Sequence, residues 1–304
     1  MSCAKPCVIT IGKFESMHQG HRKLIERVVN CAKDLDIMSA AIVFDPLPYQ
    51  YFAGDEYKVL FTKNERMRLL QGVTGLDNLH VVPFDKKIVT LTPQEFCHML
   101  FRKYMALHVV VGEDFYFGHG RTGTIELLAL EAAKYNATVE VTPVSAMPTA
   151  QGCSAISTSS IRSLLLQNKL QEANNMLGFP YFIEGTAQEG RQLGSKLGFP
   201  TLNIYPCNAK FLLPNGVYKT RTTFKDKVYN SITNIGTRPT VSNEQKISVE
   251  THMSAYTGGN LYGTFANVEF LHAIRPERRF NSINELKDQI KLDMKFITHK
   301  EETT

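Results

Sequence analysis

Two histidines with a glycine between them mark the first place in the chain that is suited to chemistry. His18 and His21 stand in VITIGKFESMHQGHRKLI (residues 8–25), where an apolar run ends at Gly12 and an amphipathic helical pattern follows. Backbone N–H groups at a helix start attract phosphate, and a glycine such as Gly20 lets the backbone approach a ligand closely. Two imidazoles there could stabilise charge in nucleotidyl transfer. A metal site, a general-base pair and plain surface positions also fit this motif alone.

A second candidate is the hydroxyl-rich turn in AISTSSIRSLLL (residues 155–166), which opens another helical pattern. Serine and threonine side chains cap helices and also bind phosphate, and Arg162 could hold a phosphate through two parallel hydrogen bonds. A plain helix cap is the alternative for this turn. A third polar segment, VVVGEDFYFGHGRTG (residues 109–123), lies between the two.

The elements that must position these residues alternate between strands and helices in the first half of the chain. The segments 62–70 and 92–100 each open with Thr followed three residues later by Glu, which is a capping-box pattern. Such alternation predicts a mostly parallel sheet whose ligands bind beyond the carboxyl ends of the strands. The loop with the two histidines lies at such an end. Apolar runs predict strands at residues 8–11, 39–44, 79–84, 107–112 and 138–144.

After about residue 180 the pattern changes to short alternating runs separated by Gly, Pro and Asn. Segments such as GVYKTRTTF and FANVEFLHAI predict antiparallel strands in a small β-barrel or sandwich. Ser282 and Glu285 form another capping box before a closing helix, on which Leu286, Ile290 and Met294 share a face. We expect the domain boundary within residues 174–185.

The bulk composition is that of an ordinary two-domain globular protein. The chain has 304 residues and a formal net charge of +5, with no dense Lys/Arg tract that would indicate nucleic-acid binding. Its six cysteines form no C-x-x-C pair, which favours free thiols over a structural zinc site. Without a signal-peptide pattern or an apolar run near 20 residues, we expect a cytoplasmic protein with no membrane segment.

Taken in order, these motifs resemble the prokaryotic bifunctional riboflavin kinase/FAD synthetase (FMN adenylyltransferase) family. The first half carries T-I-G-x-F-x-x-x-H-x-G-H, F-x-P-x-P, V-G-E-D-F-x-F-G-x-G-R-x-G and I-S-[ST]-[ST]-x-I-R. The second half carries GRQLGSKLGFPTLNI, GVY, NIGTRPT, VETH, LYG and IRPERRF. The resemblance covers roughly residues 6–295.

The resemblance implies a nucleotidyltransferase-type parallel α/β sheet domain in residues 1–180. It also implies a small riboflavin kinase β-barrel with a closing helix in residues 181–304. The implied reactions are ATP-dependent phosphorylation of riboflavin to FMN and adenylylation of FMN to FAD with release of pyrophosphate. Mg²⁺ is expected with ATP, and riboflavin, FMN and FAD are substrates or products. The implied partners are these small molecules, with no nucleic acid and no membrane, and the oligomeric state is left open.

The resemblance also implies roles for individual residues. In the transferase half, His18, His21, Ser157, Thr158, Ser159 and Arg162 would contact phosphates, Gly12, Phe14 and Gly20 would shape the loop, and Asp114 would face the nucleotide or flavin phosphate. In the kinase half, Glu250 would be the general base, although an exposed strand carboxylate is the alternative reading from pattern alone. Arg275 would order the flavin site. ATP and its Mg²⁺ would be held by Gly190, Gly194, Lys196, Gly198, Pro200, Thr201 and Asn203, with Thr201 and Asn203 on the metal.

Four residues of the transferase half depart from the usual family pattern. Glu15 and Ser16 replace Asp and Gly, Leu47 replaces a common His, and Tyr116 replaces a basic residue. In the kinase half, Ser195 stands where many bacterial members have Arg. These departures leave two alternatives to a bifunctional enzyme. Either one module alone is active, as a riboflavin kinase with a degenerate transferase or a specialised FAD synthetase paralogue, or the chain is a non-catalytic flavin-binding regulator.

Overall fold

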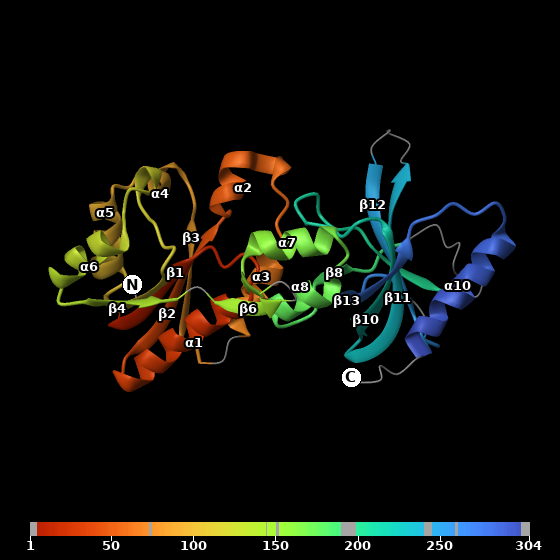
Figure 1. The fold of residues 1–304 in the computed structure, drawn as a ribbon, viewed down its shortest axis with the longest axis horizontal. Coiled ribbons are helices and arrows are strands. Elements are labelled where there is room, and N and C mark those ends of the chain that lie inside the picture. Colours follow the sequence, from red (N-terminus) through yellow and green to blue (C-terminus); the bar gives the residue numbers. More distant parts are fainter. Residues whose placement is uncertain are drawn as a thin grey trace. The chain divides into compact units, whose positions relative to one another are not determined.

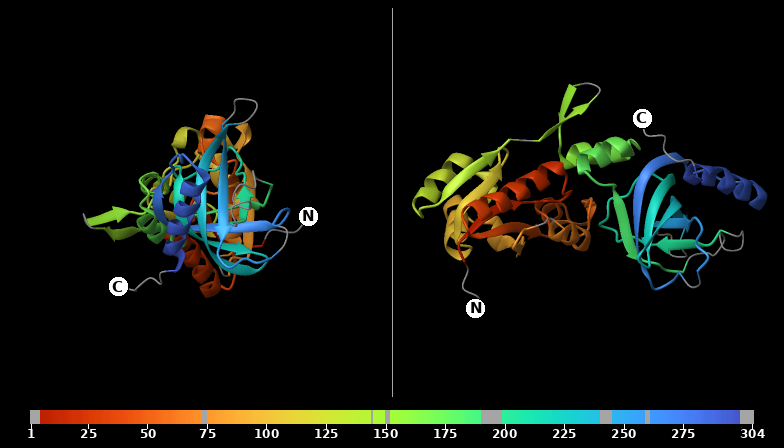
Figure 2. Two further views of the ribbon diagram at one scale, coloured as in Figure 1. Left: turned by 90° about the vertical axis from the view of Figure 1, so that its right-hand side faces the viewer. Right: turned by 90° about the horizontal axis from the view of Figure 1, so that it is seen from below.

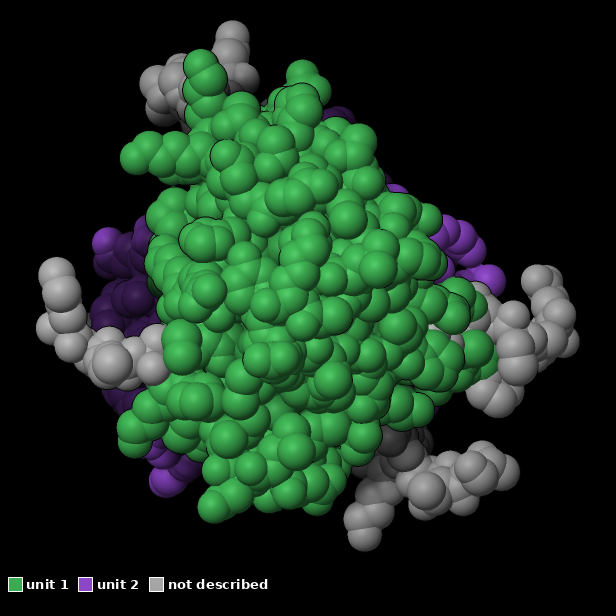
Figure 3. All heavy atoms as spheres, turned by 90° about the vertical axis from the view of Figure 1, so that its left-hand side faces the viewer, with its two compact units in different colours: residues 1–158 green, residues 159–304 purple. Residues whose placement is uncertain are grey.

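The computed structural model of the protein describes residues 5–72, 75–143, 145–149, 152–189, 199–239, 245–258 and 261–298. The chain forms two compact units, residues 1–158 and residues 159–304, which Figure 3 shows in different colours. Each unit has its own sheet and its own buried core. Among the described residues, no helix combines the length and the apolar composition that crossing a membrane requires.

The first unit is built on a five-stranded sheet in which every neighbouring pair is parallel (Figure 1). The strand order is β3-β2-β1-β4-β5, so the chain winds outward on one side of β1 and then returns to the other side. The order therefore reverses between β1 and β4, which is where ligands bind in open α/β sheets. The strands are β1 (Cys7–Gly12), β2 (Met38–Asp45), β3 (Asn78–Pro83), β4 (Ala106–Gly112) and β5 (Thr138–Thr142).

Helices cover both faces of this sheet, because its strands are apolar on both sides. On one face Val8 and Val110 pack with Val28 and Ala32 of α1. The other face packs against apolar residues of α5 and α6. The helices and helical turns are α1 (Gln19–Asp34), α2 (Pro48–Ala53), η1 (Gly54–Glu56), α3 (Lys63–Gln71), α4 (Lys86–Val89), α5 (Pro93–His98), η2 (Met99–Lys103), η3 (His119–Arg121) and α6 (Ile125–Ala133), and a hairpin of β6 (Ala146–Thr149) and β7 (Gly152–Ala155) follows.

Local sequence signals account for where several helices begin. The predicted capping boxes are present at Thr62 with Glu65 and at Thr92 with Glu95, and in each the side chains and backbone N–H groups bond reciprocally. The predicted parallel sheet is confirmed.

The second unit is built on a six-stranded antiparallel sheet of order β8-β13-β10-β11-β12-β9. The sheet curls into a barrel-like shape (Figure 2). Just beyond β8, the backbone N–H of Gln188 donates to the carbonyl oxygen of Asn203 on β9 at 2.8 Å, which joins the two edges. The predicted barrel architecture is confirmed. The strands are β8 (Phe182–Thr186), β9 (Thr201–Ile204), β10 (Gly216–Phe224), β11 (Lys227–Pro239), β12 (Gln245–Met253) and β13 (Phe265–Pro276).

Among the described residues, the helices that accompany this sheet are α7 (Thr158–Leu166), α8 (Leu170–Leu177) and α10 (Ile283–Thr298). Asn174 fixes α8 to the sheet, because its side-chain amide donates to the carbonyl oxygen of Phe270 at 2.9 Å. The closing helix α10 begins after Ser282, whose hydroxyl accepts from the N–H of Glu285 at 3.2 Å as the capping box predicts. Its partly buried face includes Leu286, Ile290 and Met294, as predicted.

Candidate active sites

The two histidines lie at the start of α1, beyond the carboxyl end of β1 and at the point where the strand order reverses. His18 is the N-cap residue, and its Nδ1 accepts a hydrogen bond from the backbone N–H of His21 at 3.2 Å. The two rings stack with centroids 3.7 Å apart, and the ring of Phe14 packs edge-on against His21 at 5.2 Å. Both imidazoles are thus held at a helix N-terminus, where N–H groups attract anions.

Both imidazoles are neutral near pH 7 because burial penalises the charged form. Burial lowers the pKa of His18 from 6.5 to about 4, against the opposing effects of a backbone hydrogen bond and the carboxylate of Asp114. Burial lowers the pKa of His21 well below its usual value, and the charges of His18 and Lys13 act in the same direction. The Nδ1 atom of His21 is buried without a hydrogen-bond partner among the described residues, which suits a polar ligand.

Close packing in the β1–α1 loop explains the two glycines predicted to shape it. A Cβ atom on Gly12 would lie 2.8 Å from the ring of Phe14, and one on Gly20 would lie 3.2 Å from the ring of His18. Phe14 itself is fully buried and has a φ of 44°, in the left-handed region that is uncommon for residues with side chains. A larger residue at Gly12 would therefore require the Phe14 ring to move, and one at Gly20 would crowd the ring of His18.

A buried arginine that no motif predicted ties this loop to the next one. Arg66 of α3 is only 2% exposed, and its guanidinium donates to the carbonyl oxygen of Lys13 at 3.2 Å and to Asp45 Oδ1 at 3.1 Å. Lys63 also pairs with Asp45 at 2.8 Å. Burial lowers the pKa of Arg66, although the carboxylates of Asp45 and Glu15 oppose that shift. Arg66 thus connects the loop that follows β1 to the carboxyl end of β2.

Two of the departures from the family pattern make specific contacts in this chain. Glu15 is buried and accepts hydrogen bonds from the Tyr57 hydroxyl at 2.7 Å and the N–H of Leu60 at 3.2 Å. The hydroxyl of Ser16 lies 2.9 Å from that of Thr158, at the start of α7. Ser16 is not among the residues with positive φ, so the glycine usual here is not required for backbone conformation. The Ser16–Thr158 hydrogen bond brings two of the predicted motifs together.

Asp114 lies just past the carboxyl end of β4, on the other side of the reversal in strand order. A Cβ atom on Gly112 would come within 3.0 Å of its carboxylate, and its charge acts on His18. The carboxylate of Asp114 thus acts on the histidine loop, and its predicted place facing the nucleotide or flavin phosphate stays a prediction. Tyr116, which replaces a basic residue, is 51% exposed, and the guanidinium of Arg121 lies 5.2 Å from its ring centroid.

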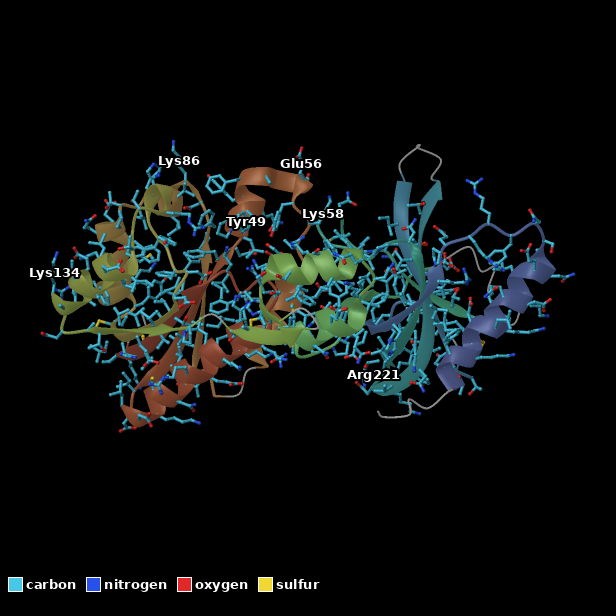
Figure 4. All side chains as sticks on the ribbon, in the orientation of Figure 1. Tyr49, Glu56, Lys58, Lys86, Lys134 and Arg221 are labelled. Carbon is cyan, nitrogen blue, oxygen red and sulfur yellow. The ribbon has the colours of Figure 1, made fainter. Side chains whose placement is uncertain are left out.

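The segment after β2 presents exposed aromatic rings beside the histidine loop, a feature that no motif predicted. Leu47 is buried at the start of α2, whereas Tyr49 and Phe52 are exposed, Phe52 by 69%. The ring of Phe52 lies 6.1 Å from that of Phe84, which follows β3. The ammonium group of Lys13 lies 4.6 Å from the ring centroid of Tyr49. Tyr49 is labelled in Figure 4.

The hydroxyl-rich motif spans the division between the two compact units. Ser157 and Thr158 belong to the first unit, whereas Ser159 and Arg162 belong to the second. In the second unit the guanidinium of Arg162 lies 5.1 Å from the ring centroid of Phe211. The predicted phosphate contacts of these residues stay a prediction.

In the second unit, strand register places the predicted base beside a predicted metal ligand. Glu250 on β12 pairs directly with Asn203 on β9 and with Asn234 on β11, so their side chains share a face of the sheet. The hydroxyl of Ser248 donates to Glu250 at 3.4 Å. The amide of Asn203 donates to the carbonyl oxygen of Thr201 at 3.3 Å. Asn234 and Ser248 were not predicted, because their position depends on the register between strands.

The surroundings of Pro200 are equally defined. Its carbonyl oxygen accepts a hydrogen bond from Nδ1 of His252 at 3.0 Å, and His252 pairs with Thr201 across the ladder. Burial lowers the pKa of His252. The predicted ATP-binding residues Gly190, Gly194, Lys196 and Gly198 lie outside the described residues, as does Ser195.

Arg275, predicted to order the flavin site, binds the closing helix. Its guanidinium makes hydrogen bonds of 2.8, 3.1 and 3.2 Å to the carboxylate of Asp293 on α10. Gln289 donates to the same carboxylate at 2.6 Å. The Asp293 side chain is 4% exposed and that of Arg275 is 18% exposed. In this structure Arg275 therefore fastens α10 to β13, and its contact with flavin stays a prediction.

Comparisons with known proteins identify the family. A family model described as FAD synthetase matches residues 1–157, and one described as Riboflavin kinase matches residues 177–300. The curated bifunctional riboflavin kinase/FMN adenylyltransferase of Escherichia coli (strain K12) is 33% identical over 290 residues, which cover 94% of this chain and 90% of that protein. The protein of the same name from Haemophilus influenzae is 31% identical over 298 residues, covering 95% of this chain and 92% of its own.

A solved structure supports the fold alone. The crystal structure titled as a macrolide-efflux protein from Streptococcus pneumoniae matches with a TM-score of 0.85 and 24% identity, over 99% of this chain and 96% of that one. The two family models and the curated relatives show the family of the chain, whereas the solved structure shows only its fold. The chain belongs to the family of bifunctional riboflavin kinase/FMN adenylyltransferases.

Proposed function

We propose that this protein phosphorylates riboflavin to FMN with ATP and then transfers AMP from a second ATP to FMN, which yields FAD and pyrophosphate. Both family models and the names of the curated relatives support the two reactions. The observation that carries the proposal is that each compact unit holds its own set of family residues. The first holds the stacked histidines at the reversal of strand order, and the second holds the paired Asn203 and Glu250.

In adenylyl transfer, a phosphate oxygen of FMN attacks the α-phosphorus of ATP and pyrophosphate leaves. We assign His18 and His21 to the ATP phosphates. Because Nδ1 of His18 accepts a hydrogen bond, the neutral ring carries its proton on Nε2, where it donates to phosphate oxygens. Such donors stabilise the charge that develops on the reacting phosphates. Gly12, Phe14 and Gly20 give the loop its shape in this assignment.

We assign Asp114, Ser157, Thr158, Ser159 and Arg162 to the same reaction. Hydroxyl groups at the start of α7 and a guanidinium are suited to phosphate oxygens. The hydrogen bond between Ser16 and Thr158 supports the part of this assignment that lies in the first unit. The rings of Tyr49 and Phe52 are exposed, and an aromatic ring face is suited to stacking on the flavin ring system.

In the kinase reaction, we assign Glu250 as the base that takes the proton of the ribityl 5′-hydroxyl as it attacks the γ-phosphorus of ATP. The hydroxyl of Thr201 and the amide oxygen of Asn203 are oxygen ligands of the kind that Mg²⁺ prefers, and they lie on the face that carries Glu250. We assign them to the Mg²⁺ that accompanies ATP and neutralises its phosphate charge. Gly190, Gly194, Lys196, Gly198 and Pro200 are assigned to ATP itself.

We assign adenylyl transfer to residues 1–180 and the kinase to residues 181–304. The FAD synthetase model ends at residue 157 and the Riboflavin kinase model begins at residue 177, which supports this order. The segment between them holds α7 and most of α8, whose residues from 159 onward cluster with the second unit. We assign Arg275 to ordering the flavin site, which it would do by fixing α10 through its ion pair with Asp293.

The test is to incubate the protein with riboflavin, ATP and Mg²⁺, and separately with FMN, ATP and Mg²⁺, and to resolve the flavins by chromatography over time. FMN followed by FAD is the expected result. Accumulation of FMN alone would mean that the changes at Glu15, Ser16, Leu47 and Tyr116 have removed adenylyl transfer. FAD from supplied FMN alone would mean that the kinase is inactive, and binding of flavin and ATP without turnover would indicate a regulator.

A further inference from the structure

Three side chains with metal-binding atoms meet under α1, outside both proposed active sites. Cys31 comes from α1, His108 from β4 and Glu140 from β5. One ligand atom from each lies within 4.8 Å of the other two. His108 precedes the carboxyl end of β4 at Gly112 by four residues, which is about 13 Å of strand. This group therefore lies near the amino-terminal end of the sheet, whereas the histidine loop lies at the carboxyl end.

The distances within the group fit a tetrahedral ion. A zinc ion with ligand bonds of about 2.0–2.3 Å holds its ligand atoms roughly 3.3–3.5 Å apart. Here Nε2 of His108 lies 3.4 Å from Oε2 of Glu140, and Sγ of Cys31 lies 3.8 Å from the same oxygen. These two separations are within a few tenths of an ångström of the tetrahedral values, and the ligand atoms of Cys31 and His108 lie within 4.8 Å of each other.

The histidine is oriented as metal-binding histidines are. Its Nδ1 lies 2.6 Å from the hydroxyl of Thr138, which leaves Nε2 to face the cysteine and the carboxylate. Such a hydrogen bond from the far ring nitrogen fixes the ring and raises the basicity of the ligating nitrogen. Cys31 is buried, whereas His108 and Glu140 are partly exposed, so water can reach the group from one side and serve as the fourth ligand.

An ion that binds Glu140 must displace one or both of the hydrogen bonds that Arg27 donates to this carboxylate. Its guanidinium donates to Oε1 of Glu140 at 2.6 Å and to Oε2 at 2.9 Å. The arginine is nearly half exposed and can swing toward solvent, keeping its bond to Oε1 or releasing both. The same positive charge lies close to the position of the ion and weakens its binding.

We propose that Cys31, His108 and Glu140 form a site for one zinc-like divalent cation, with water as the fourth ligand. The thiol of Cys31 releases its proton to solvent as the sulfur binds the metal, His108 and Glu140 bind as the neutral imidazole and the carboxylate, and no other covalent bond of the protein is made or broken. This site is distinct from that of the Mg²⁺ assigned to ATP, because a thiolate and an imidazole prefer ions that are softer than Mg²⁺. Since Cys31 connects α1 to β4 and β5, a bound ion stabilises the first unit.

The experiment is a titration of the full-length protein with Co²⁺, which reports a thiolate ligand by a charge-transfer absorption in the near ultraviolet. We expect the band to saturate at one Co²⁺ per chain and to disappear on addition of Zn²⁺. Cys31→Ser should remove the band. Cys97→Ser is the matched control, because Cys97 is also buried but lies on α5, against the opposite face of the sheet. It should leave the band unchanged.

Arg27→Gln gives the sharpest test, since it predicts a gain. Removing the guanidinium should tighten Co²⁺ binding several-fold, whereas His108→Gln and Glu140→Gln should weaken it at least tenfold. The last two variants decide the matter if Cys31→Ser does not fold. No band in the unmodified protein, a band that persists in Cys31→Ser, or unchanged affinity in both His108→Gln and Glu140→Gln would overturn the proposal.

Discussion

At the scale of single residues, the state of the two imidazoles decides what they can do. With their pKa values lowered by burial, His18 and His21 are uncharged near pH 7, and their stacked rings stand at a helix N-terminus. Neutral donors there bind phosphate without carrying a fixed charge, and an approaching polyanion favours protonation of the rings. The pair is therefore better suited to stabilising phosphate charge than to acting as a general base.

Replacing His21 by Ala should lower the rate of FAD formation from FMN by at least about 100-fold, as expected for loss of a donor to a reacting phosphate. FMN formation from riboflavin should be nearly unchanged. Both rates are measured by chromatography of the flavins. His98→Ala is the control, because His98 is an exposed histidine of the same unit and should leave both rates unaltered. Equal loss of both activities in His21→Ala would contradict the assignment.

The low pKa of His18 predicts how the stability of the first unit depends on pH. In the unfolded chain the imidazole takes up a proton below about pH 6.5, whereas in the folded unit it does so only near pH 4. The contribution of the neutral ring is therefore fully present above pH 6.5 and is lost as the pH falls toward 4, by at most about 1.4 kcal/mol per pH unit.

Urea unfolding at several pH values checks this dependence. His18→Asn keeps an N-cap side chain but cannot titrate, so its free energy of unfolding should fall less steeply over the same pH range. Parallel curves for the two proteins would show that His18 is not responsible.

At the scale of elements, the loops of the first unit are held by contacts that are specific to this chain. Glu15 reaches Tyr57 and Leu60, and Ser16 reaches Thr158, so the unusual residues occupy defined positions. These contacts favour a histidine loop with a defined conformation over the degenerate loop of an inactive transferase. The contact between Ser16 and α7 matters most, because it joins the histidine loop to the hydroxyl-rich motif.

Ser16→Ala should raise the KM for ATP in FAD formation by up to about tenfold, since a hydrogen bond of this kind is worth about 0.5–1.5 kcal/mol. The kinase step should keep its KM. Ser163→Ala is the control, because Ser163 lies on α7 with Thr158 and its exposed hydroxyl accepts a hydrogen bond from the side chain of Gln167. An unchanged KM in Ser16→Ala would show that the contact does not position the phosphate-binding residues.

The second unit depends on the pair that fastens its closing helix. Asp293→Ala should destabilise this unit by about 3 kcal/mol, because it leaves the mostly buried Arg275 without its partner. Thermal unfolding should show a lower midpoint, and Asp288→Ala, whose side chain is well exposed on the same helix, should not. A wild-type midpoint for Asp293→Ala would mean that α10 is held by its apolar face alone.

Features encoded within one element could be predicted from the sequence, and those that depend on partners far along the chain could not. The strands of the first sheet and the helix starts at Thr62 and Thr92 follow from apolar runs and capping residues. Arg66 was not predicted, because its partners at Lys13 and Asp45 are set by the order of the strands. Asn234 joins Glu250 only through strand register.

The same limit applies to the proposed cation site and to Ser16. Zinc-site spacing rules examine ligands that are near one another in sequence, whereas Cys31, His108 and Glu140 come from three elements. Ser16 replaces a glycine, the residue type that best tolerates positive φ, yet the positive φ values in this loop fall on Phe14 and Met17. Backbone angles of a loop depend on its packing and are not visible in a motif.

At the scale of the whole molecule, the two reactions are assigned to separate sets of residues. The kinase set lies in the second compact unit, and the transferase set lies in the first apart from Ser159 and Arg162. FMN made by the kinase is then a released product that any transferase site can use. One chain with an intact kinase and another with an intact transferase should therefore complete the pathway from riboflavin to FAD together.

The most direct test mixes His21→Ala with Glu250→Gln and supplies riboflavin, ATP and Mg²⁺. Alone, His21→Ala should convert riboflavin only as far as FMN. Glu250→Gln should form FMN at a rate reduced at least about 100-fold, but it should adenylylate supplied FMN at the normal rate. The mixture should produce FAD, and the double variant should not. If both single variants fold and the mixture makes no FAD, the two activities do not reside in independent sites, and the assignment of the two reactions to separate sets of residues is wrong.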